Sequence, residues 1–115
     1  LLALSPLDVG QGAVVAGGLC LGIETLQGTD ALLRFVAETP AHLRRAEGGV
    51  LVKAPKRGQD LRVDMPTIGP DTIEAVAKAG LSTIVLAAGA VIVLNRDETC
   101  ESAKAAGISI VAQEF

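Results

Sequence analysis

The sequence contains few of the side chains with which proteins recognise nucleic acids. Among its 115 residues there are two Phe, no Trp and no Tyr, and the formal net charge is −3. Nucleic-acid binding relies on a basic surface and, for single strands, on aromatic side chains that stack on the bases. The composition therefore argues against a nucleic-acid partner.

Residues that build metal centres and disulfide frameworks are also scarce. Cys20 and Cys100 stand far apart, no CxxC occurs, and the chain has one His. Neither a zinc site nor a disulfide scaffold is indicated. We expect both cysteines to be reduced and buried, as in a cytosolic protein.

Long apolar runs are missing as well. The longest, Ile84 to Leu94, is far shorter than the ~20 residues that span a bilayer, so no transmembrane helix is expected. The opening Leu1-Leu2-Ala3 has no basic segment ahead of an apolar one, which argues against a signal peptide. Because Met65 is the only methionine, we expect the chain to be a piece of a longer polypeptide.

Apolar residues are nevertheless abundant. They make up 50% of the sequence, and the mean hydropathy is +0.47. A chain of this length forms one domain around one core. Since this hydropathy is high for a small soluble monomer, we expect some apolar surface to meet another domain, a second copy or a ligand.

Turn and cap residues divide the chain into alternating strands and helices. Gly17-Gly18 suits a two-residue hairpin turn, Thr29 is a candidate N-cap, and a second hairpin is expected across Ala88-Gly89. The expected elements are strands 13–16 and 19–24, helix 29–39, strand 50–54, a helix opened by Gly69-Pro70-Asp71 and stopped by Gly80, strands 83–87 and 90–94, a helix from Asp97 to Gly107, and strand 108–111. This order predicts an α/β domain: a mixed β-sheet with covering helices, two β-hairpins and three helices.

A short internal similarity is visible in the second half of the chain. The words AKAGLSTIV (77–85) and AKAAGISIV (103–111) both run from a helix through a glycine into an apolar strand. Two units are too few for a solenoid. The similarity indicates only that two helices end, and two strands begin, in the same way.

The polar stretch LVKAPKRGQDLRVDMPTIG (51–69) collects charges of both signs between apolar strands. Its cations can balance phosphate charge and its carboxylates can bind Mg²⁺, a combination that suits a Mg²⁺-dependent phosphate site. In an extended segment Asp60 and Asp64 share one face roughly 13 Å apart, and in a turn they could converge. The alternative is a solvated rim of ordinary ion pairs. The charged residues are Lys53, Lys56, Arg57, Asp60, Arg62 and Asp64.

Other motifs carry little chemistry. Gly10-Gln11-Gly12 lacks the third glycine of a dinucleotide-binding fingerprint and precedes a hairpin, so we interpret its glycines as turn residues. P-loop, nucleophile-elbow and HExxH motifs do not occur in the sequence. Glu24 and Asp30 flank the junction between hairpin and helix, where the helix dipole favours Asp30 without any function. His42 is expected at the surface.

Four words of the sequence, in order, resemble the C-terminal domain of the LpxI family of UDP-2,3-diacylglucosamine pyrophosphatases. They are LDVGQGAVVAGG, IETLQGTDALL, GGVLVKAPKRGQDLRVDMPTIGPDT and AGLSTIVLAAGAVIVLNRDET, and they cover nearly the whole chain. The resemblance implies Mg²⁺-dependent hydrolysis of UDP-2,3-diacylglucosamine to UMP and 2,3-diacylglucosamine 1-phosphate (lipid X), by water attack on the α-phosphorus. It places the protein in lipid A biosynthesis of Gram-negative bacteria.

The resemblance also implies roles for individual residues. The essential aspartate of the family falls on Asp64, with Asp60 second, and both are expected to act in catalysis and to hold Mg²⁺. Asp8 and Glu24 are further expected members of the same polar wall. The expected substrate-binding residues are Lys53, Lys56, Gln59, Arg62, Thr67, Gln11, Thr29 and Asp30.

Members of the family carry an N-terminal domain ahead of this one, which implies that the substrate lies between two domains. We therefore expect the isolated chain to be inactive, and the whole protein to be cytoplasmic, peripheral to the inner membrane and able to form a homo-oligomer. Two other classes stay open: a non-catalytic module that binds a sugar nucleotide or lipid phosphate, and a structural or interaction domain. Restoring the N-terminal domain and assaying for UMP separates an enzyme from both of these classes, and the effect of Lys53→Ala and Arg62→Ala on the affinity for phosphate ligands separates the two classes from each other.

Overall fold

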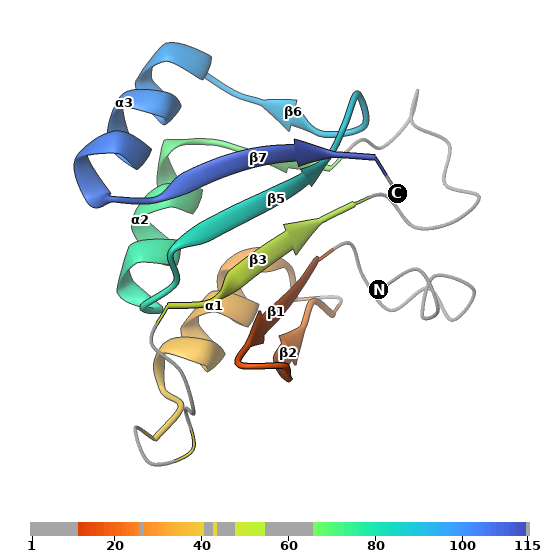
Figure 1. Cartoon of the computed structure of the whole chain (residues 1–115), viewed down its shortest axis with the longest axis vertical. Helices are drawn as coiled ribbons and strands as arrows, with labels where there is room; N and C mark the ends of the chain where they lie inside the picture. Colours follow the sequence, from red (N-terminus) through yellow and green to blue (C-terminus); the bar gives the residue numbers. More distant parts are fainter. Residues whose placement is uncertain (1–11, 26, 41–42, 44–47, 55–65, 115) are drawn as a thin grey trace.

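The computed structural model describes residues 12–25, 27–40, 43, 48–54 and 66–114. Within these ranges strands and helices alternate along the chain (Figure 1). The elements are β1 (Gly12–Ala16), β2 (Leu19–Ile23), α1 (Thr29–Ala37), β3 (Val50–Lys53), β4 (Thr67–Ile68), α2 (Pro70–Lys78), β5 (Thr83–Ala87), β6 (Ile92–Val93), α3 (Arg96–Ala106) and β7 (Ser109–Gln113).

Five strands form the main sheet in the order β2-β1-β3-β5-β7. β1 pairs antiparallel with β2 and with β3, whereas β3, β5 and β7 run parallel. β4 and β6 form a separate two-stranded parallel sheet. The mixed-sheet α/β class is thus confirmed. The first hairpin is confirmed too, because Gly17 and Gly18 turn it with positive φ angles of 58° and 79°.

One face of the main sheet and the helices enclose the core. Strand register aligns one apolar residue from each of four neighbouring strands: Val14, Leu51, Ile84 and Ile110. Since side chains alternate along a strand, this row points to one side of the sheet. The helices cover that side, and their apolar stripes complete the core with Leu33, Val36, Ile73 and Val76.

The opposite face of the main sheet is apolar and only partly covered. Val52 and Val85 are half-buried there, whereas Val15 and Val111 are 36% and 44% exposed. Apolar side chains left open on a sheet face are typical of a surface that meets a partner. This face agrees with the expectation drawn from the hydropathy, and the nature of the partner stays a prediction.

The second half of the chain consists of two similar units lying side by side. In the units β4-α2-β5 and β6-α3-β7, β4 pairs with β6, β5 pairs with β7, and α2 packs on α3. Each helix is followed by a glycine of positive φ, Gly80 (75°) and Gly107 (72°). The shared pattern of the words at 77–85 and 103–111 therefore reflects two equivalent helix-to-strand connections. Because the strands pair in parallel, the starts of α2 and α3 lie on one side of the molecule.

The second predicted hairpin is wrong. The chain does turn after Ala87, where the Ala90 N–H donates to the Ala87 carbonyl. However, β5 lies inside the sheet and both of its edges are already hydrogen-bonded, to β3 and to β7. The chain beyond the turn therefore leaves the main sheet, and β6 pairs with β4, a strand that was not predicted from the sequence.

Two helix starts also differ from the prediction. Thr29 is not the N-cap of α1, because Gly28 occupies that position and Thr29 is the first helical residue. α3 begins at Arg96 behind an N-cap at Asn95, so Asp97 lies inside its first turn. In α1 the reason is that the Thr29 hydroxyl is bonded to the side chains of Glu24 and Lys53 rather than to its own helix.

The cysteines are free, as expected, but both are exposed rather than buried. Cys20 lies on β2, the edge strand of the main sheet, and Cys100 lies on α3. A small apolar side chain is buried only where another element covers its face. Across the described ranges, no helix has the length and apolar character needed to cross a membrane.

Candidate functional site

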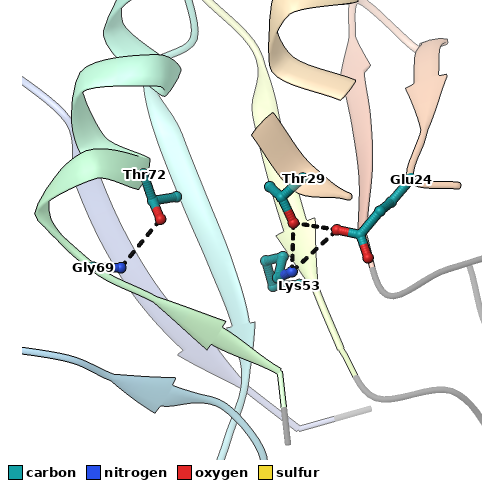
Figure 2. A network of polar contacts seen from close by, with 5 residues as sticks. All are labelled: Glu24, Thr29, Lys53, Gly69 and Thr72. Atoms are coloured by element: carbon teal, nitrogen blue, oxygen red, sulfur yellow. Dashed lines mark hydrogen bonds and ion pairs between the residues drawn. The ribbon is translucent and has the colours of Figure 1, made fainter. Parts of the chain in front are cut away.

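A buried ion pair joins three elements at the carboxyl end of β3 (Figure 2). Lys53 Nζ lies 3.2 Å from Glu24 Oε1 and donates a 2.8 Å hydrogen bond to Thr29 Oγ1. The Thr29 hydroxyl donates in turn to Glu24 Oε1. Because Glu24 follows β2, Thr29 opens α1 and Lys53 ends β3, the network ties the start of α1 to the main sheet.

Both charges of this pair are almost completely removed from water. The Lys53 and Glu24 side chains are 4% and 9% exposed. An isolated buried charge is very costly, so pairing and hydrogen bonding are what allow these two groups to be buried. The solvated-rim alternative is therefore wrong for Lys53. Its expected contact with a pyrophosphate stays a prediction, and two protein groups already engage its ammonium.

Gly12 provides the space for this pair. It lies directly opposite Lys53 in the pairing of β1 with β3. A Cβ atom at this position would lie 3.3 Å from Glu24 Oε1 and 3.4 Å from Lys53 Cδ, and the Gly12 carbonyl accepts a 2.8 Å hydrogen bond from the Glu24 N–H. The interpretation of Gly12 as a turn residue is wrong. Gly12 is a residue of β1, and its lack of a side chain leaves room for the ion pair of Glu24 and Lys53.

Replacing Gly12 by Ala is expected to lower the free energy of unfolding by about 1–2 kcal/mol, since overpacking displaces the buried pair. Urea denaturation of the 115-residue chain, followed by circular dichroism, measures this loss. Gly69→Ala is the matched control, because a Cβ there meets nothing closer than 3.5 Å and the backbone is extended. Unchanged stability of Gly12→Ala would contradict the packing role of this glycine.

A cavity of about 560 Å³ lies where all three of the described helices begin. Its wall consists of residues 27–30, 67–72, 94, 95 and 98. At the start of α2, the Gly69 N–H donates to Thr72 Oγ1 over 3.1 Å (Figure 2). The N-terminus of a helix carries unsatisfied N–H groups and partial positive charge, which favours anionic groups beside it.

The charged side chains of the cavity wall are acidic. Asp30, Asp71 and Glu98 each belong to the first turn of a different helix, and no Lys, Arg or His is among the described residues of the wall. The helix dipoles stabilise these carboxylates. A phosphate ligand entering the cavity would meet three negative charges, so it requires additional cations.

The structure brings three of the predicted substrate-binding residues to one place. Thr29, Asp30 and Thr67 all line the cavity, although they come from two separate parts of the chain. Lys53 lies in the buried network behind Thr29. The other predicted site residues lie outside the described residues and their roles stay predictions: Asp64, Asp60, Lys56, Gln59, Arg62, Gln11 and Asp8.

Sequence reasoning missed several members of this site. Glu24 had been expected in the polar wall, but its pairing with Lys53 could not be read from a separation of 29 positions. Asp71 had been seen only as part of a helix start, and Glu98 had not been considered. The available signal was the repeated order of strand, helix start and acidic first turn, at Asp71 and again at Asp97 and Glu98.

The side-chain atoms of the cavity wall that could coordinate a metal ion are oxygens, which suit hard cations such as Mg²⁺. Within the described part of the chain, however, no three Asp, Glu, His or Cys side chains lie close enough together to hold a metal ion.

The fold and the site define a class: an α/β domain with a mixed sheet and an acidic ligand cavity at the starts of its helices. The model of the LpxI C-terminal domain matches residues 1–111, so this chain belongs to that family. It is 50% identical over 108 residues to the UDP-2,3-diacylglucosamine pyrophosphatase LpxI of Caulobacter vibrioides. The match covers 91% of this chain but 39% of that relative.

Proposed function

We propose that this chain is the C-terminal catalytic part of a UDP-2,3-diacylglucosamine pyrophosphatase. The reaction adds water across the pyrophosphate: the oxygen of water bonds to one of the two phosphorus atoms, and the bond from this phosphorus to the bridging oxygen breaks. The products are UMP and 2,3-diacylglucosamine 1-phosphate. Membership of the LpxI C-terminal domain family and the name of the 50% identical relative support this reaction.

The observation that carries the proposal is the cavity that gathers Thr29, Asp30 and Thr67. Open α/β sheets generally bind their ligands beyond the carboxyl ends of the strands, where loops and helix starts meet. Here the cavity lies at the starts of the helices, and the network of Lys53 lies at the carboxyl end of β3. In the chain, residues 55–65, which contain Asp60 and Asp64, connect β3 to β4.

Chain connectivity limits how far Asp64 can lie from the cavity. It precedes Thr67 by three positions, and three trans peptide units span at most about 11 Å between Cα atoms. Thr67 itself lines the cavity. This short separation along the chain supports the proposed role of Asp64 in catalysis, with Asp60 as the second carboxylate.

The acidic wall supports Mg²⁺ as the cofactor. A pyrophosphate repels the carboxylates of Asp30, Asp71 and Glu98 unless cations accompany it. Asp60 and Asp64 would hold Mg²⁺, and the ion would neutralise phosphate charge and polarise the phosphoryl oxygens. Lys56 and Arg62 would contact phosphate oxygens, and Gln59, Gln11 and Thr67 would bind the substrate. Since Glu24 balances the charge of Lys53, we assign Lys53 to the support of Thr29 beside the ligand.

A further part of the protein belongs to the proposed site. The chain spans 39% of the length of the relative that it matches, and the activity named there is that of the longer protein. We propose that the N-terminal domain, or a second copy, covers the apolar sheet face of Val15 and Val111. We also propose that the protein contacts a membrane, because its proposed substrate carries two acyl chains and the sheet face of Val15 and Val111 is apolar.

Release of UMP by the full-length protein tests the proposed function. With UDP-2,3-diacylglucosamine in detergent micelles and Mg²⁺, we expect equal amounts of UMP and lipid X, and loss of turnover when EDTA removes the metal. Residues 1–115 alone are expected to be inactive. Tight binding of the substrate without any UMP release by the full-length protein would instead identify a binding module.

A further inference from the structure

The first turn of α1 is anchored in an unusual way. Its N-cap, Gly28, has φ 93° and makes no side-chain capping bond. The hydroxyl of Thr29, the next residue, is directed away from the helix and into the buried pair of Glu24 and Lys53 (Figure 2). The first turn of α1 is thus held by hydrogen bonds to Glu24 and Lys53 rather than by a side-chain cap.

We propose that Glu24 is a positioning residue, which holds Thr29 through the pair with Lys53 and thereby sets the wall of the cavity formed by the first turn of α1. The proposal rests on the proposed function, because it concerns the cavity assigned to the substrate. Glu24 itself does not line the cavity, whereas Gly28, Thr29 and Asp30 do. Its influence on the substrate must therefore pass through Thr29.

The hydrogen-bonding capacities of the three groups leave one arrangement. The ammonium of Lys53 can only donate, the carboxylate of Glu24 can only accept, and the Thr29 hydroxyl has a single proton. Thr29 therefore donates to Glu24 and accepts from Lys53, which matches the observed contacts. The hydroxyl cannot rotate without breaking a charge-assisted hydrogen bond, and such bonds are roughly twice as strong as neutral ones.

This arrangement also determines what Thr29 can offer to a ligand. Its proton is committed to Glu24, so the hydroxyl can present only an acceptor to the cavity. An ionised phosphate oxygen is itself an acceptor and would gain no hydrogen bond from this hydroxyl. A ligand group that bonds the Thr29 hydroxyl must therefore be a donor, such as a sugar hydroxyl or a bound water.

The full-length protein with Glu24→Gln tests the positioning role. Glutamine keeps the shape of the side chain but removes the charge that balances Lys53. Because small misplacements of a binding wall strongly slow catalysis, we expect kcat/KM for UMP release to fall by at least about tenfold. Glu74→Gln is the matched control: Glu74 forms an ion pair of the same 3.2 Å length with Lys78, but in solvent. It should leave kcat/KM unchanged.

A double variant separates positioning from mere stability. Glu24→Gln leaves an uncompensated buried ammonium, and Glu24→Gln combined with Lys53→Met removes both charges. We expect the double variant to regain most of the lost melting temperature without regaining kcat/KM, since Thr29 still lacks both of its charge-assisted hydrogen bonds. Thr29→Ser, which keeps the hydroxyl, should retain most of the activity that Thr29→Val loses. Recovery of kcat/KM in parallel with the melting temperature would overturn the proposal.

Hydrogen exchange of the α1 amides gives a readout that does not depend on turnover. Faster exchange is expected in Glu24→Gln and in the double variant at Leu32, whose N–H donates to the Gly28 carbonyl across the first turn of α1, and no change is expected in Glu74→Gln. If the unsubstituted protein releases no UMP, the proposed function fails, and exchange then decides the positioning role by itself. Unchanged exchange at the first turn of α1 would overturn that role.

Discussion

Replacing Asp64 by Ala is expected to lower kcat for UMP release by about 10³-fold in the full-length protein. Removal of a carboxylate that holds Mg²⁺ against the pyrophosphate withdraws several kcal/mol of transition-state stabilisation, and each 1.36 kcal/mol corresponds to a factor of ten. The expectation depends on the proposed metal-binding role of Asp64, three positions ahead of Thr67 in the cavity wall. Initial rates of UMP release over a range of Mg²⁺ concentrations measure both kcat and the Mg²⁺ requirement.

Asp97→Ala is the matched control for this variant. Asp97 is an exposed carboxylate in the first turn of α3 and does not line the cavity. Its removal costs at most the favourable interaction with the helix dipole, about 0.3–1 kcal/mol of stability, and should leave kcat unchanged. Near-normal turnover of Asp64→Ala would remove this residue from the mechanism, and equal losses in both variants would point to a general loss of structure.

Replacing Leu51 by Ala is expected to lower the free energy of unfolding by about 3 kcal/mol. Leu51 lies on β3, the middle strand of the main sheet, and its side chain is 0% exposed. Truncation removes its contacts with the aligned Val14 and Ile84 and leaves a cavity that the paired strands on both sides cannot collapse to fill.

Urea denaturation followed by far-UV circular dichroism measures this loss, since the chain has no Trp or Tyr to report by fluorescence. Leu43→Ala is the control, because Leu43 is 55% exposed and the same truncation there should change stability by less than about 0.5 kcal/mol. Equal effects of the two substitutions would contradict the placement of Leu51 in the core.

Local signals account for the parts of the fold that were predicted correctly. The Gly17-Gly18 turn pairs β1 with β2, Pro70 opens α2, and Gly107 ends α3 with a φ of 72°. Each of these features depends on residues within a few positions of one another. Backbone restrictions of Gly and Pro act at that range, so the sequence alone is sufficient to reveal them.

The second hairpin shows where local signals stop being sufficient. The turn after Ala87 is present, yet it does not pair the strands on its two sides. Neither edge of β5 is free, because β3 and β7 occupy both, and these strands are brought to it by connections through helices. The same limit applies to the candidate site, because Thr29 and Thr67 line one cavity only after the sheets and helices have packed.

The sequence itself determined the order of the helices and of every strand except β4, together with the glycine stops and the apolar stripes, since these depend on residue type and spacing. It also determined the membership of the LpxI C-terminal domain family. The pairing of β6 with β4, the burial of the Glu24–Lys53 pair and the acidic cavity at the starts of the helices were decided by the tertiary structure. Their physical cause is long-range: charges and strand edges far apart in the chain find partners only when the core excludes water.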